Sequence, residues 1–173
     1  MVEEKQTYVI ATIVENKPGV LYRVANMFRR RGFNIESISV GVSEKKDLSR
    51  MTITVKGDEL LVEQVIKQLN KLIDVVKVSI LEPTSIVARE LALVKVHTPD
   101  SKARSDIIHY VNIFRGRIID VATESMIIEV TGDPEKIDAF TDLMKTFGVK
   151  EIARTGITAL GRGVKAVKIE EES

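Results

Sequence analysis

The pattern of apolar residues repeats one order of strands and helices, and this repeat limits the folds that the chain can adopt. Alternating apolar residues predict a strand, whereas an apolar stripe at helical spacing predicts a helix. In the first half the patterns predict four strands and two helices, with strands at 7–14, 34–42, 50–56 and 74–81 and helices at 20–31 and 59–72. This order is β-α-β-β-α-β, the split βαβ or ferredoxin-like arrangement. Both helices then cover one side of a sheet, and the other side needs a partner.

The second half returns to the same order. Strands are predicted at 91–96, 118–122, 126–131 and 149–153, with helices that open at 99–101 and 132–134. The letters repeat as well: FRRRG at 28–32 is echoed by FRGR at 114–117, and VKGD at 55–58 by VTGD at 130–133. Gly32 and Gly116 are expected to end the first helix of each half.

We therefore predict an α+β fold of two tandem ferredoxin-like domains, at 1–83 and 84–173. Two alternatives stay open for the tail at 156–173, a flexible end or a segment that orders on a partner.

Composition excludes several classes of function. The 26 Lys+Arg against 25 Asp+Glu leave a net charge of +1, which gives no general attraction to nucleic acid or to a membrane surface. The same fold hosts RNA-binding modules, but those need aromatic residues on the central strands, and aromatics are only 5% here. No apolar run approaches the roughly 18 residues of a membrane span. Without cysteine or a signal-peptide pattern at the start, the chain is expected in the cytoplasm.

No group of residues predicts catalysis. The chain has two histidines, His97 and His109, and neither has metal-ligand spacing or a serine partner in an elbow motif. Phosphate-binding glycine motifs are absent from the sequence. We expect no catalytic residue and no metal site in this chain.

The stretch 15–20 (ENKPGV) is the strongest candidate for a binding site. Asn16 is a candidate N-cap, Pro18 suits a first helical turn, and Gly19 allows close approach of the backbone. The N–H groups of a helix N-terminus suit a small anion such as a carboxylate. Taken alone, the stretch favours a capped helix start without a ligand. The second half has Thr98-Pro99-Asp100 here, with a carboxylate that would repel an anion, so a sensor site belongs to the first half.

Four segments in order resemble the small regulatory subunit of acetolactate synthase (acetohydroxyacid synthase). They are ENKPGVLYRV at 15–24, RGFNIES at 31–37, LSRMT at 48–52 and FRGRIIDV at 114–121. The resemblance runs from about residue 8 to residue 162. It implies an N-terminal ACT domain, which binds an effector and pairs edge to edge in a homodimer, and a second, regulatory ferredoxin-like domain.

The resemblance also implies a function without catalysis in this chain. The small subunit would activate a catalytic large subunit and confer feedback inhibition by valine, in branched-chain amino acid biosynthesis. Thiamine diphosphate, Mg²⁺ and FAD would be held by the large subunit, and no cofactor by this chain. The alternative is a stand-alone ACT-type amino-acid sensor that acts on another enzyme or on transcription.

The residues implied for valine binding come from both ends of the first helix. Asn16 and Gly19 fall in the effector loop, with Val20 and Leu21 beside them, and Asn34 and Ile35 follow the helix. Val20, Leu21 and Ile35 are expected to line an apolar pocket. At about 1.5 Å per residue, Gly19 and Asn34 are about 20 Å apart, too far to hold one small ligand. The site is therefore predicted to take Gly19 from one chain and Asn34 from its partner.

Overall fold

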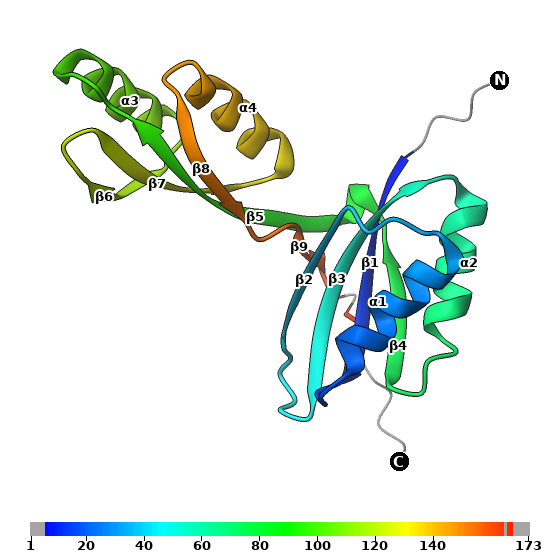
Figure 1. Cartoon of the computed structure of the whole chain (residues 1–173). Helices are drawn as coiled ribbons and strands as arrows, with labels where there is room; N and C mark the ends of the chain where they lie inside the picture. The colour runs from blue at the N-terminus through cyan, green and yellow to red at the C-terminus, as the bar shows by residue number, and fades with distance from the viewer. Residues whose placement is uncertain (1–5, 165, 168–173) are drawn as a thin grey trace. The chain divides into compact units, whose positions relative to one another are not determined.

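The computed structural model describes residues 6–164, 166 and 167 (Figure 1). Contacts divide the chain into two compact units. Unit 1 runs up to Val87 and includes the segment that begins at Ile157, while unit 2 is Ala88–Gly156. The boundary between units thus lies at 87/88, whereas the sequence places it at 83/84, and the segment after 156 groups with unit 1.

Unit 1 holds a four-stranded antiparallel sheet in the order β2-β3-β1-β4. Its elements are β1 (Gln6–Glu15), α1 (Val20–Arg31), β2 (Ser37–Val42), β3 (Leu48–Gly57), α2 (Glu59–Leu69) and β4 (Val75–Leu81), followed by the short 3₁₀ helix η1 (Pro83–Ser85). The strand predicted from residue 34 begins at Ser37, because the first ladder bond runs from the Glu36 N–H to the Thr54 carbonyl, 2.9 Å. β2 is at one edge of the sheet.

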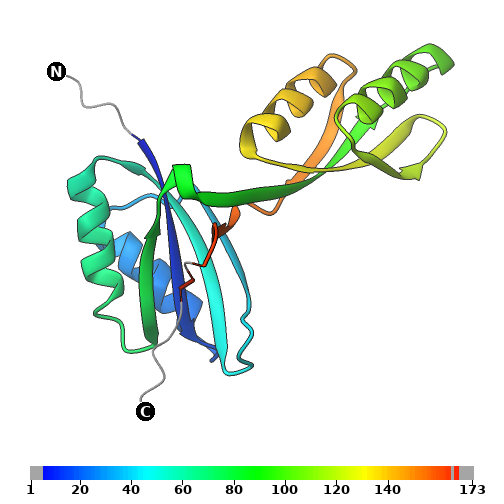
Figure 2. The ribbon, with the colours of Figure 1, turned by 180° about the vertical axis from the view of Figure 1, so that it is seen from behind.

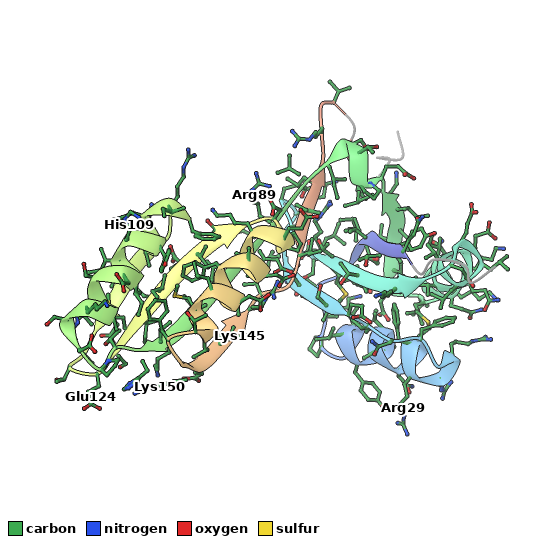
Figure 3. The ribbon with its side chains drawn as sticks, turned by 90° about the horizontal axis from the view of Figure 1, so that it is seen from above. Arg29, Arg89, His109, Glu124, Lys145 and Lys150 are labelled. Carbon is green, nitrogen blue, oxygen red and sulfur yellow. The ribbon has the colours of Figure 1, made fainter. Side chains whose placement is uncertain are left out.

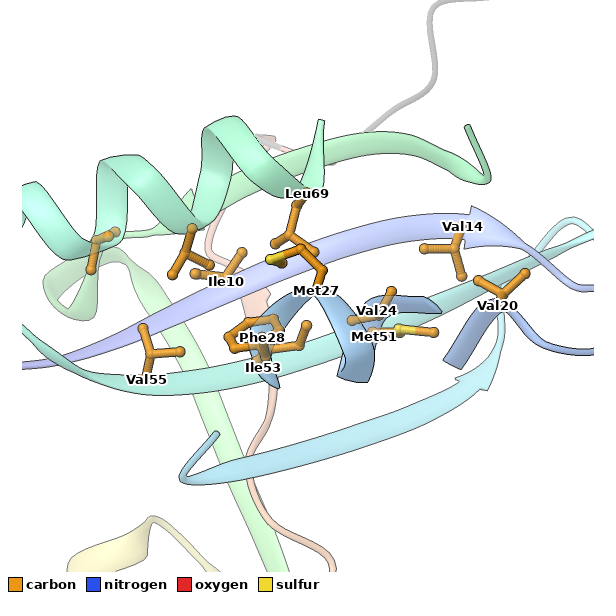
Figure 4. Close-up of a cluster of buried hydrophobic side chains, with 12 residues drawn as sticks. Ile10, Val14, Val20, Val24, Met27, Phe28, Met51, Ile53, Val55 and Leu69 are labelled. Atoms are coloured by element: carbon orange, nitrogen blue, oxygen red, sulfur yellow. The ribbon is translucent and has the colours of Figure 1, made fainter. Parts of the chain in front are cut away.

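The core of unit 1 lies between the sheet and its two helices (Figure 4). The predicted stripes of both helices face it, since Val24 and Phe28 of α1 and Leu69 of α2 are all buried. Ile10 and Ile53, paired across β1 and β3, fill the sheet side. This core fixes both ends of α1, and so the positions of the turn before it and the loop after it.

The other side of the sheet is covered by residues 157–162, which we call the strap; it contains β9 (Thr158–Gly161) (Figure 2). Val9, Ala11 and Ile13 point to this side, and all three are buried. Ala159 of the strap is only 1% exposed. The partner that the sheet needs on this side is therefore a segment of the same chain.

Polar contacts hold the strap on β2 and β3. Ser39 Oγ donates to the Ile157 carbonyl at 3.0 Å, and Arg50 Nη2 donates to the Ala159 carbonyl at 2.9 Å. At the end of the strap, the Arg162 N–H donates to the Ser85 carbonyl at 2.8 Å. Up to residue 162, the tail is therefore held on the sheet of its own chain, an arrangement that neither sequence alternative described. Residues 165 and 168–173 of the predicted tail lie outside the described residues.

Unit 2 repeats the fold with the strand order β6-β7-β5-β8. Its elements are β5 (Ile86–His97), α3 (Ser101–Ile113), β6 (Arg117–Val121), β7 (Ser125–Gly132), α4 (Pro134–Lys145) and β8 (Val149–Arg154); β5 also pairs with β9. Its core contains Val94, Ile107, Ile128 and Phe140, all fully buried. The prediction of two ferredoxin-like domains is confirmed.

The ends of α1 and α3 differ in a way that the sequence does not reveal. Gly32 is left-handed (φ 68°) and ends α1, as predicted. After α3 the left-handed residue is Arg115 (φ 52°), not Gly116. Gly116 is needed for a different reason, because a Cβ there would lie 3.0 Å from the Glu129 carbonyl oxygen.

Candidate functional site

The turn before α1 differs in detail from the prediction. The helix begins at Val20, and its N-cap is Gly19 in the left-handed conformation (φ 86°, ψ −8°). Asn16 is therefore not the cap: its Nδ2 donates to the Lys46 carbonyl at 3.2 Å and ties the turn to the β2–β3 loop. Pro18 precedes the helix instead of entering its first turn. Because Gly19 takes the left-handed conformation at the N-cap, Asn16 and Pro18 both lie outside the helix.

The start of α1 exposes unpaired backbone donors. The N–H groups of Leu21 and Tyr22 find no acceptor among the described residues. The N–H of Val20 makes one long bond, 3.4 Å, to the Lys17 carbonyl. Because helix dipoles leave positive potential at the N-terminus, these donors suit a small carboxylate.

The other three α-helices in the described part of the chain have a capping carboxylate. Asp58, Asp100 and Asp133 accept backbone N–H bonds at the starts of α2, α3 and α4, at distances of 2.7, 2.8 and 2.9 Å. Each carboxylate satisfies a donor and places negative charge where an anion would bind. Among the described α-helices, α1 alone begins without a side-chain cap. The second half thus keeps a carboxylate at the position where the first half has Gly19, and the sensor site in the first half stays a prediction.

An ion pair that the sequence analysis missed lies directly beneath the turn. Arg23 Nη2 donates to Asp74 Oδ1 at 2.7 Å, and Arg23 Nε to Asp74 Oδ2. The Arg23 hydrogen bonds hold the pKa of the buried Asp74 carboxyl below its ordinary value, against the opposing effect of burial. The Asp74 carbonyl also accepts the Glu15 N–H at 2.9 Å. The pair thus joins the end of β1, the first turn of α1 and the start of β4.

Arg23 also limits what can replace Gly19. A Cβ on Gly19 would lie 3.3 Å from Arg23 Nη1, in addition to the strain of the left-handed backbone. The only sequence signal for this pair was an arginine near the helix start. Its partner is 51 residues away, a separation that no local pattern connects.

Asn34 and Ile35 lie after the opposite end of α1. Asn34 is exposed, and its Nδ2 donates to Glu36 Oε1 at 2.7 Å. Ile35 is partly buried against the core. The 12-residue helix separates them from Gly19, so one chain does not bring the two halves of the predicted site together.

The apolar candidates at the helix start face different ways. Val20 is 3% exposed and belongs to the core, so it offers its backbone rather than its side chain. Leu21 is 49% exposed and lies next to the free donors.

Metal-binding clusters are not found among the described residues, where no three His, Cys, Asp or Glu side chains group together. His97 Nδ1 lies 3.0 Å from the Glu124 carbonyl, and His109 points away from the body of unit 2 (Figure 3). The described helices include none that is long and apolar enough to cross a membrane.

Comparison with known proteins identifies the family. Residues 10–77 match the model of the AHAS small subunit-like ACT domain, and residues 89–163 match the model of the small subunit of acetolactate synthase. A probable acetolactate synthase small subunit of Methanothermobacter thermautotrophicus is 58% identical over 95% of this chain and 98% of its own length. The chain belongs to the acetolactate synthase small-subunit family.

Other small subunits agree in sequence and in structure. A probable acetolactate synthase small subunit of Archaeoglobus fulgidus is 61% identical over 91% of this chain and 98% of its own length. The crystal structure of the acetolactate synthase small subunit of Thermotoga maritima, 49% identical, superposes with a TM-score of 0.86 over 91% of this chain and 98% of that one. Both units therefore belong to one small-subunit architecture, and unit 1 is its ACT domain.

Proposed function

We propose that this chain is the non-catalytic regulatory subunit of acetolactate synthase, which activates the catalytic large subunit and makes it sensitive to valine. The observation that carries the proposal is the uncapped start of α1 at Gly19, in a chain of the small-subunit family. Thiamine diphosphate, Mg²⁺ and FAD belong, in this proposal, to the large subunit. This chain then contributes regulation and no chemistry, and it works in the cytoplasm.

The valine carboxylate would accept hydrogen bonds from the free N–H groups of Leu21 and Tyr22. The Asn16 side chain is held in place through Nδ2, and its Oδ1 accepts no hydrogen bond from the described residues. That oxygen suits the ammonium group of an amino acid. Leu21, half exposed beside the donors, offers apolar contact to an isopropyl group.

The second half of the pocket would come from a partner chain. β2 lies at the sheet edge, and its Val40 and Val42 are exposed, 47% and 63%. An edge strand with free backbone groups and apolar side chains favours pairing with another strand. A homodimer joined at this edge would let Asn34 and Ile35 of one chain serve the turn at Gly19 of the other.

Valine regulates the enzyme in this scheme only if it binds one arrangement of subunits better than another. A coupling free energy of about 1–3 kcal/mol is typical of allosteric proteins and would change the affinity roughly 5–150-fold. The rigid support of the turn by Arg23 and Asp74 suits such coupling, because a change at the pocket is passed to β1 and β4.

Reconstitution tests the proposal. The purified chain is mixed with the large subunit, and acetolactate formation is measured with and without valine. We expect higher activity on mixing and inhibition by valine of the mixture only. Leucine and isoleucine are assayed in parallel to rank the effectors. If the chain binds valine in calorimetry but changes nothing in the large subunit, it is a stand-alone sensor and the proposal is wrong.

A further inference from the structure

A hollow of about 340 Å³ lies between α1 and α2, and half of the residues that line it are positively charged. Four of its lining residues are cationic: Arg23, Arg30 and Arg31 of α1, and Lys71 just after α2. Within the described part of the chain, no carboxylate side chain lines it. The chain as a whole balances 26 basic against 25 acidic residues, so this hollow departs sharply from the average surface.

Most of this charge has no counter-ion among the described residues. Arg23 is paired with Asp74, but Arg31 Nη2 donates only to the neutral Gln68 Oε1, at 3.0 Å. The side chains of Arg30 and Lys71 make no hydrogen bond or ion pair with any described residue, although the Lys71 N–H donates to the Gln68 carbonyl at 3.2 Å. Like charges held in one hollow repel each other, and an anionic partner would remove that repulsion.

The size and floor of the hollow indicate what kind of anion fits. Arg23 and Arg31 are eight residues apart on α1, about 12 Å along the helix axis, so the cationic side chains are anchored along the hollow and not at one point. Met27, 8% exposed, and the partly buried Leu72 give an apolar floor between the charges. Several carboxylates spaced along a peptide, with aliphatic stems over an apolar floor, match this layout better than a point-like ion.

We propose that the hollow between α1 and α2 binds an acidic segment of the catalytic large subunit. This inference rests on the proposed function, because it names the surface through which the regulatory subunit meets its partner. Such a contact sets the association rate and its dependence on salt, since complementary charges steer two proteins together.

A charge reversal with a matched control tests the proposal. The double variant Arg30→Glu/Lys71→Glu reverses the unpaired cations. The control is Arg29→Glu, since Arg29 is a neighbour on α1 that does not line the hollow and points away from it to solvent (Figure 3). Binding of each full-length variant to the large subunit is measured by surface plasmon resonance at low and high salt. Thermal unfolding and valine calorimetry report on the fold, and Arg30→Gln/Lys71→Gln replaces the double variant if that variant does not fold.

We expect the double variant to associate at least about tenfold more slowly at low salt and to lose most of the salt dependence. The control should behave as the unmodified chain, and valine binding should be unchanged in both. The inference is overturned if the double variant and the control bind alike, or if pyrophosphate saturates the hollow without competing with the large subunit. No binding by the unmodified chain would instead defeat the proposed function itself.

Discussion

At the scale of single residues, the candidate site depends on Gly19 more than on the polar residue before it. The sequence predicted a special turn there because Pro and Gly precede an apolar stripe. It assigned the cap to Asn16, yet Asn16 donates to the Lys46 carbonyl and Gly19 itself is the N-cap. The local sequence does not predict a left-handed N-cap. Whether Asn16 or Gly19 caps the helix depends on the β2–β3 loop, whose Lys46 carbonyl accepts the hydrogen bond from Asn16.

Gly19→Asp should abolish inhibition by valine while leaving activation of the large subunit intact. The added carboxylate would stand at the N-terminus of α1, where it would compete with the valine carboxylate for the same N–H groups. Gly19→Asn is the matched control, because it adds the same bulk near Arg23 without charge. Valine titrations of the reconstituted enzyme should show a much larger loss for Asp than for Asn. Full sensitivity of the Asp variant to valine would remove Gly19 from the site.

Asp74→Asn should lower the melting temperature and weaken valine binding together, because Asp74 holds Arg23 beneath the turn. The pKa of Asp74 is lowered in the folded chain, mainly by its hydrogen bonds with Arg23. Its stabilising effect is therefore complete above the unfolded pKa of about 3.9 and is lost as the pH falls through the folded pKa. Denaturant unfolding from pH 7 to pH 3 should show a constant gap between the two chains down to about pH 4, and a shrinking gap below. A gap that closed already at neutral pH would contradict this role.

At the scale of elements, periodicity predicted the strands and helices well, since each apolar stripe does face a core. The strap could not be predicted. Its partners Ser39 and Arg50 are 118 and 109 residues away from Ile157 and Ala159, and its four-residue strand carries no periodic signal. The sequence does show that the sheet needs a second cover, but not which segment provides it.

Ala159→Phe should destabilise unit 1 by about 1–3 kcal/mol, because a large ring has no space between the strap and the sheet. Leu160→Phe is the control at the next position, which is 59% exposed, and should cost at most about 0.5 kcal/mol. Hydrogen exchange should quicken in residues 157–162 of the first variant only. Equal exchange in both variants would mean that the strap does not need the Ala159 contact.

Arg115→Gly should stabilise unit 2. A left-handed residue other than glycine costs about 1–2 kcal/mol, and glycine loses about 0.5–1 kcal/mol more backbone entropy, so a net gain of about 0.5–1 kcal/mol is expected. Arg117→Gly, in the extended strand β6, should instead destabilise, since there is no strain to relieve. Urea unfolding compares the two, and a loss of stability at Arg115 would show that its side chain matters more than its backbone.

At the scale of the whole molecule, the two halves of the predicted valine site lie at opposite ends of α1. The same residues therefore predict different behaviour for a site within one chain and a site shared between two. In a homodimer with shared sites, each site takes Gly19 from one chain and Asn34 from the other. A dimer of identical variant chains then has two damaged sites, whichever residue is changed.

Mixing two variants separates these arrangements. If one chain carries Gly19→Asp and its partner Asn34→Ala, a shared arrangement puts both changes in one site and leaves the other site intact. Mixed dimers, purified through two different affinity tags, should recover about one valine site per dimer in calorimetry, while each single-variant dimer binds weakly. If both residues served a site within one chain, every site of the mixed dimer would keep one damaged residue and nothing would be recovered. Recovery of binding on mixing therefore requires that the partner's Asn34 completes the pocket at Gly19.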